Sequence, residues 1–152
     1  MSIPIFFNAK NTNCLFGLKK DFNFLQNLYQ NNNLPKVLLL SGKKGIGKFT
    51  LVNNFLLSVF DKKNYDMDKL FISSKSNIFN QIINNTFPNL IYLNGSAFKS
   101  VKIDDIRKLK KIINQTSILN KHRFIIFDDI ELFNSNSLSA LLKMIEEPGK
   151  NN

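Results

Sequence analysis

The residues between 42 and 50 are the clearest candidates for chemistry in this chain. Gly42, Gly47 and Lys48 follow the spacing G-x-x-x-x-G-K, with Gly45 as an additional glycine inside the loop. Glycines let backbone N–H groups turn toward a phosphate, and the lysine reaches the phosphate oxygens. The sequence therefore predicts a nucleotide-binding phosphate loop. We expect ATP to contact the loop and the turn after it, through Gly42, Lys43, Lys44, Gly45, Ile46, Gly47, Lys48, Phe49 and Thr50.

Phe49 departs from the usual pattern at the position after the lysine. That position normally carries a serine or threonine whose hydroxyl binds magnesium, and a phenyl ring offers no oxygen. Thr50 has a hydroxyl, but a shift of one residue turns it by about 100° around a helix. Thr50 therefore does not replace the metal ligand. The sequence favours nucleotide binding over hydrolysis.

A second acidic element follows the apolar run at residues 124–127 and consists of Asp128 and Asp129. At the carboxyl edge of a parallel sheet, Asp128 would face the phosphate loop and hold magnesium through water. Asp129 stands where many ATPases place a glutamate that polarises water, and its shorter side chain leaves a catalytic role open. The alternative is that both residues cap the turn into the next segment.

A strand before the loop and a helix after it must position these residues. The continuous apolar run at residues 36–41 is typical of a strand covered on both faces, and residues 49–60 have the length and period of a helix. The same reasoning predicts two further strands, at 89–95 and 122–129. Further helices are expected at 15–30, 78–87, 101–119 and from about 134 onward, with Pro88 and Pro148 ending two of them. This alternation predicts an α/β fold with a parallel sheet.

Composition limits the kinds of site and the cellular location that the chain can have. The chain has 152 residues, a formal net charge of +10 and one cysteine, so neither an internal disulfide nor a four-thiolate zinc site can form. Cys14 is the single cysteine and His122 the single histidine of the sequence, which favours structural or surface positions over ligand roles. We find neither a signal peptide nor an apolar run of membrane length, and we expect a cytoplasmic protein. A local basic excess leaves contact with DNA open; it comprises Lys99, Lys102, Lys108, Lys110, Lys111, Lys121 and Arg123.

Several stretches resemble the delta-prime subunits of the bacterial DNA polymerase III clamp loader, which belong to the AAA+ class. The resemblance runs through LFGL, LPKVLLLSGKKGIGK, FPNLIYL, IDDIRKLKKII and FIIFDDIELFNSNSLSALLKMIEEP, and the last stretch is the most specific. It implies an AAA+ parallel sheet flanked by helices. Residues 1–152 would then be an incomplete N-terminal nucleotide-binding domain, truncated after the helix that follows the second acidic motif. The sensor strand, the arginine finger, and the lid and collar domains would be missing.

The resemblance also implies a role. Clamp loaders are hetero-pentameric rings that open a sliding clamp and place it on primer–template DNA during replication, and delta-prime is a stationary member with a weakened or absent nucleotide site. By resemblance, Gly42, Gly45, Gly47, Lys48 and Asp128 match the nucleotide motifs, with ATP and magnesium as cofactors. The cysteine-rich zinc module of many relatives is absent, so no zinc is expected. Whether the subunit is itself an enzyme stays open.

Three other interpretations compete with this one. An active gamma- or tau-type clamp-loader ATPase normally carries a hydroxyl after the lysine and a glutamate in the second motif, and Phe49 and Asp129 argue against it. A small-molecule or nucleotide kinase would need an arginine-rich lid, whereas the chain has only Arg107 and Arg123. The third interpretation is an α/β domain whose glycine-rich loop has no function.

The family's sheet order has a consequence for stability. It places the first strand between the fourth and fifth, and neither of these would be present. Residues 37–41 would then lack both ladder neighbours. We therefore expect the isolated chain to be unstable or to associate.

Overall fold

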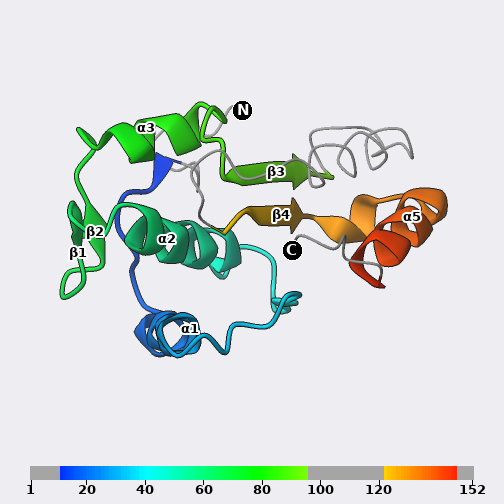
Figure 1. Ribbon diagram of the computed structural model, residues 1–152, viewed down its shortest axis with the longest axis horizontal. Coiled ribbons are helices and arrows are strands. Elements are labelled where there is room, and N and C mark those ends of the chain that lie inside the picture. Colours follow the sequence, from blue (N-terminus) through cyan, green and yellow to red (C-terminus); the bar gives the residue numbers. More distant parts are fainter. Residues whose placement is uncertain (1–10, 96–121, 147–152) are drawn as a thin grey trace. The chain divides into compact units, whose positions relative to one another are not determined.

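The computed structural model describes residues 11–95 and 122–146 (Figure 1). The chain divides into two compact units, Met1–Thr86 and Phe87–Asn152. The described elements of the first unit are α1 (Lys19–Gln30), α2 (Lys48–Phe60), β1 (Tyr65–Asp66), β2 (Phe71–Ile72) and α3 (Asn77–Ile83). Those of the second are β3 (Leu90–Asn94), β4 (Phe124–Asp128), the 3-10 helix η3 (Ile130–Leu132) and α5 (Ser135–Glu146). In the described ranges, no helix is long and apolar enough to cross a membrane.

Two of the helices in the first unit form much of its apolar core, and both were predicted. On α1, Phe22 and Leu25 are buried, as the amphipathic spacing requires. On α2, burial extends over most of the helix and includes Leu56 and Leu57. The ring of Phe22 stacks on that of Tyr65 with centroids 5.9 Å apart, so α1 also packs against β1.

Two buried polar side chains on α2, those of Asn54 and Ser58, are paired within this core. Asn54 accepts a hydrogen bond from the Tyr65 hydroxyl at 3.1 Å, and Ser58 accepts one from Gln26. Burying a polar group without a partner is costly, so such pairs determine which side chains can face each other. They tie α2 to both α1 and β1.

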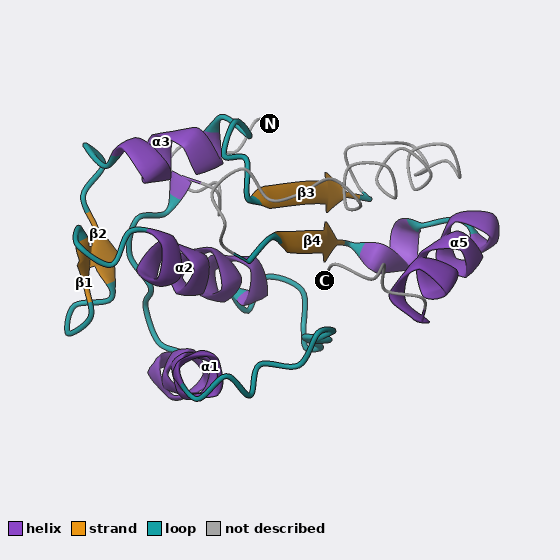
Figure 2. Ribbon diagram, in the orientation of Figure 1, coloured by secondary structure: helices purple, strands orange, loops and turns teal. Residues whose placement is uncertain are grey.

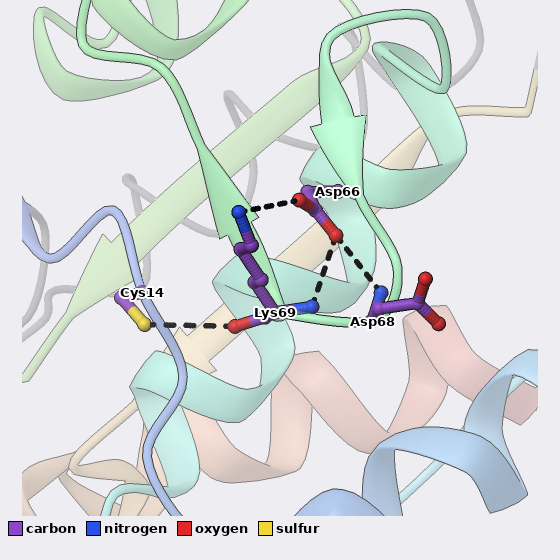
Figure 3. A network of polar contacts seen from close by, with 4 residues as sticks. All are labelled: Cys14, Asp66, Asp68 and Lys69. Atoms are coloured by element: carbon purple, nitrogen blue, oxygen red, sulfur yellow. Dashed lines mark hydrogen bonds and ion pairs between the residues drawn. The ribbon is translucent and has the colours of Figure 1, made fainter.

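A short hairpin between α2 and α3 was not predicted. β1 and β2 pair antiparallel, with Asp66 opposite Phe71. The Asp66 carboxylate accepts hydrogen bonds from the N–H groups of Asp68 and Lys69 at 3.0 and 2.9 Å, which closes the turn (Figure 3). Cys14 forms an isolated bridge with Phe71, and its thiol donates to the Lys69 carbonyl at 3.8 Å. Two-residue strands are too short for a period-two pattern to show, which explains the omission.

The prediction that Pro88 ends the helix over 78–87 is wrong. The helix α3 stops at Ile83, and Asn85 takes a left-handed conformation with φ of 55°. Asparagine tolerates this conformation better than most residues, and it breaks the helical path well before Pro88. The beginning of α3 is capped by Ser76, whose hydroxyl accepts from the N–H of Phe79 at 3.1 Å.

The second unit is built on a parallel pair of strands, and both strands were predicted. β3 and β4 pair from Leu90 opposite Phe124 to Asn94 opposite Asp128. One face of the pair packs on Phe133 and on α5; its members are Ile91, Leu93 and Phe127. The predicted helix after the second acidic motif is confirmed as α5. The helix predicted over 101–119 lies outside the described residues.

The predicted strand at residues 36–41 does not form. The segment between α1 and α2 is drawn as loop, and Val37, Leu38 and Leu39 are 54%, 45% and 78% exposed (Figure 2). A strand exists through ladder hydrogen bonds, and the sheets of the described chain are the pairs β1–β2 and β3–β4. An apolar run without a neighbouring strand therefore stays irregular. The chain is a mixed α/β protein with a small parallel sheet.

Candidate nucleotide-binding site

The glycine-rich loop has the backbone conformation that its residue types predict. Gly42, Gly45 and Gly47 have φ values of 151°, 84° and 96°. Residues with a Cβ adopt this region only at a cost, so the glycines permit the sharp turn into α2. Gly47 is the N-cap of α2 and offers no side chain to its first N–H groups. A glycine-rich loop that leads directly into a helix start is the arrangement of many anion-binding sites.

Lys48 folds back over the loop from the first position of α2. Its Nζ donates to the carbonyl of Gly42 at 2.9 Å and to that of Lys43 at 3.1 Å. These bonds hold the ammonium against the loop backbone, where a phosphate oxygen would compete for it. The side chains of Lys43 and Lys44 are exposed, which adds positive charge to the same loop.

The positions after the lysine lie in the first turn of α2 and are partly buried. Phe49 supplies no oxygen there, and Thr50 uses its carbonyl to accept from the Asn54 side chain at 3.0 Å. The beginning of α1 also reaches the loop, since a Cβ placed on Gly47 would lie 3.4 Å from Leu18. Leu18 was not singled out by the sequence, because only the fold brings it to the loop.

Asp128 ends β4 in the second unit with both carboxylate oxygens hydrogen-bonded. One oxygen accepts from the Tyr92 hydroxyl at 2.9 Å, and the other accepts from the N–H of Asp129 at 3.1 Å. Tyr92 in turn accepts from the Asn94 amide at 3.0 Å. Parallel pairing explains the cluster: Asn94 is opposite Asp128, and Tyr92 lies two residues earlier on the same face.

The pKa of Tyr92 is raised well above its usual value, first by burial and then by its hydrogen bond to Asp128. The hydroxyl therefore keeps its proton near neutral pH and remains a donor to the carboxylate. Neither Tyr92 nor Asn94 was among the predicted site residues. Polar residues alternate toward the end of β3, and this is the sequence feature that could have indicated a site there. Only the register of β4 shows that they lie beside Asp128.

Asp129 begins η3 in a left-handed conformation with φ of 49°, and its side chain makes no capping hydrogen bond. Its carbonyl oxygen is placed 2.5 Å from where a Cβ on Gly95 would stand. The backbone of Asp129 thus shapes the end of the sheet. Its role in polarising water stays a prediction.

The residues fit a phosphate group better than a magnesium ion. The loop offers glycines with positive φ and a lysine, whereas the Phe49 side chain has no oxygen and Asp128 accepts hydrogen bonds from the protein. Within residues 11–95 and 122–146, there is no group of three or more His, Cys, Asp or Glu that could hold a metal. The loop lies in the first unit and Asp128 in the second, so the prediction that they face each other stays a prediction.

These features define a mixed α/β protein with a small parallel sheet and a glycine-rich loop at the start of a helix, which is compatible with a clamp-loader domain. A family model described as DNA polymerase III, delta subunit, matches residues 17–152. The chain belongs to this family of clamp-loader proteins. A comparison with curated proteins found no match.

Proposed function

We propose that this chain is a delta-prime-type subunit of the DNA polymerase III clamp loader. In this role it takes part in placing the sliding clamp on primed DNA during replication, in the cytoplasm. Its direct partners are the other clamp-loader subunits of a hetero-pentamer. It acts on the sliding clamp through them, and primer–template DNA is a further partner. Membership of the family supports the assignment.

The observation that carries the finer assignment is the pair Lys48 and Phe49 at the start of α2. Lys48 lies against the loop carbonyls, where it can bind phosphate, and the next residue lacks the hydroxyl that would hold magnesium. Such a loop retains nucleotide binding while losing the metal that neutralises charge during phosphoryl transfer. A subunit that holds nucleotide without turnover fits a stationary place in the ring.

Steady-state ATP hydrolysis separates this function from the gamma- or tau-type alternative. We expect the chain, assembled with its clamp-loader partners, to add no hydrolysis above that of an assembly carrying Lys48→Ala in this chain. Hydrolysis that disappears with Lys48→Ala would instead show an active motor subunit. Failure to assemble with any clamp-loader subunit would contradict both assignments.

A further inference from the structure

Two pairs of exposed lysines from separate segments of the first unit lie at the start of α1 and in the glycine-rich loop. They are Lys19, Lys20, Lys43 and Lys44. A Cβ placed on Gly47 would lie 3.4 Å from Leu18, so the start of α1 and the loop are close in space. Within residues 11–95 and 122–146, none of the four lysines is ion-paired, and the acid in the first turn of α1 is Asp21. The lysines therefore concentrate positive charge on one part of this unit.

Two exposed phenylalanines accompany the lysines of α1. Phe16 is 84% exposed and precedes the helix by a few residues, and Phe24 is 60% exposed on the helix itself. Phe24 follows Lys20 by four residues, so the two side chains lie on the same face of α1. The buried face of this helix carries a different ring, that of Phe22. The exposed rings are thus not part of the core, and they lie beside cations.

A single strand of nucleic acid has the two chemical features that complement cations and exposed rings. Its phosphates bind to cations along the backbone, and its unpaired bases stack on aromatic side chains. A double-stranded partner would explain the lysines but not the rings, because its bases are already stacked on one another. A free nucleotide has too few phosphates to engage lysines of both segments along a backbone. Charge and ring exposure together favour the single strand.

We propose that single-stranded DNA binds to this part of the first unit, with its phosphates on the lysines and its bases on the two rings. We call it the α1–loop surface, and its members are Phe16, Lys19, Lys20, Phe24, Lys43 and Lys44. The inference rests on the proposed function, in which the chain meets primed DNA whose unprimed template is single-stranded. It adds the place on this chain where that strand lies.

The lysines are tested by the salt dependence of binding of a fluorescent oligodeoxythymidine of about 16 nucleotides to the full chain. Lys19→Gln/Lys20→Gln removes two phosphate contacts, so the slope of log affinity against log salt should become shallower by about 1.4. The affinity should fall by about fivefold or more. Lys62→Gln/Lys63→Gln is the matched control. It removes the same charge from two adjacent exposed lysines that follow the far end of α2, and it should leave the slope unchanged.

The rings are tested by comparing this oligonucleotide with an abasic strand of the same length, which keeps the phosphates and lacks the bases. Phe16→Leu/Phe24→Leu keeps two apolar side chains and removes both rings. We expect it to weaken binding of the oligodeoxythymidine by about tenfold or more, because stacking on the rings is lost. Binding of the abasic strand should change by less than about twofold. The double lysine variant should weaken both strands alike.

Three outcomes would overturn the proposal. Equal slopes in the two double lysine variants would show that net charge alone governs binding. Equal affinities of the unaltered chain for the base-bearing and abasic strands would show that no base stacks on the rings. Binding of a duplex of the same length as tightly as the single strand would show that the partner is double-stranded.

Failure of the inference and failure of the proposed function give different results. If the unaltered chain binds no oligonucleotide but assembles with the other clamp-loader subunits, the α1–loop surface is not a DNA site and the proposed function stands. If the chain assembles with none of them, the proposed function is wrong. The inference, which places this strand on a clamp-loader subunit, is then wrong with it.

Discussion

In the proposed function, the residue after the loop lysine determines whether a bound nucleotide can be hydrolysed. Lys48 offers a positive charge and the loop glycines have positive φ, a combination that suits phosphate regardless of a metal. Catalysis of phosphoryl transfer requires more, because charge that develops on the transferring group must be stabilised. In the proposed function, Phe49 would separate nucleotide binding from turnover at a single side chain.

Restoring an oxygen at position 49 should restore dependence on magnesium. We expect Phe49→Thr to tighten binding of an ATP analogue in magnesium by about fivefold or more relative to EDTA, because the new hydroxyl is a ligand for the ion. Phe49→Leu is the control, since it changes the ring without adding an oxygen and should show no such effect. Equal magnesium effects in the two variants would contradict the explanation.

Residue types and spacing were enough to predict the loop, and its backbone conformation follows the glycine positions. Tyr92 and Asn94 were not predicted, for a physical reason. Their role comes from lying beside Asp128 on a neighbouring strand. A single sequence shows where polar residues occur within one strand, but it does not show which residue of another strand stands opposite.

At the scale of elements, the end of the β3–β4 pair is held by a close backbone approach. Gly95 donates its N–H to the Asp128 carbonyl at 2.9 Å, and a Cβ on Gly95 would lie 2.5 Å from the Asp129 carbonyl oxygen. A backbone oxygen cannot move aside as a flexible side chain can. The strand end that carries Asp128 therefore depends on the glycine that follows the neighbouring strand β3.

Gly95→Ala should lower the free energy of unfolding by roughly 1–3 kcal/mol, because the added methyl forces the backbone apart. Chemical denaturation would measure the change. Gly17→Ala provides a comparison: its φ is 67°, but nothing lies within 4 Å of the new Cβ. It should cost only about 1 kcal/mol of conformational strain. An unchanged free energy of unfolding in Gly95→Ala would show that the chain has room for a methyl group beside the Asp129 carbonyl oxygen.

The beginning of α5 depends on Asn134. Its side-chain oxygen accepts from the N–H of Ser137 at 2.8 Å. Asn134→Ala should therefore destabilise the chain by about 1 kcal/mol, while Asn134→Asp should retain most of the stability. Asn136→Ala alters an exposed residue of the same first turn and should have little effect. Thermal unfolding of the three variants would measure these changes in stability. Equal stability of Asn134→Ala and Asn136→Ala would show that the Asn134 side chain does not cap α5.

Elements with a strong period or clear end signals were predictable, including α1, α2, β3, β4 and α5. Those that depend on long-range pairing or on short turns were not. The run at residues 36–41 has the composition of a buried strand, yet no strand of the described chain pairs with it. Conversely, β1 and β2 have almost no pattern of their own and arise around the turn closed by Asp66.

At the scale of the whole molecule, the exposed apolar run before the loop is the feature that most favours association of the isolated chain. Val37, Leu38 and Leu39 lie on the surface in an irregular segment. An apolar stretch with unpaired backbone groups is a template for pairing with another chain. The expectation that the isolated chain is unstable or associates remains a prediction, and this exposure supports it.

Leu39→Lys should reduce association of the isolated chain, because it places a charge in the most exposed part of the run. Sedimentation over a range of concentrations would measure the effect. Leu142→Lys is the control, since Leu142 is also an exposed leucine but lies on α5, in the other unit. Monomeric, cooperative unfolding of the unaltered chain at all concentrations would contradict the prediction.

The central claim is that the glycine-rich loop binds nucleotide through Lys48. Its most direct test is equilibrium binding of a fluorescent ATP analogue to the unaltered chain, to Lys48→Ala and to Lys44→Ala. Both substitutions remove one positive charge from the same loop, but the Lys48 ammonium donates to the carbonyls of Gly42 and Lys43, whereas Lys44 is exposed. We predict that Lys48→Ala weakens binding by about tenfold or more while Lys44→Ala changes it by less than about threefold. Equal affinities for the unaltered chain and Lys48→Ala, or no binding by any of the three, would contradict the account.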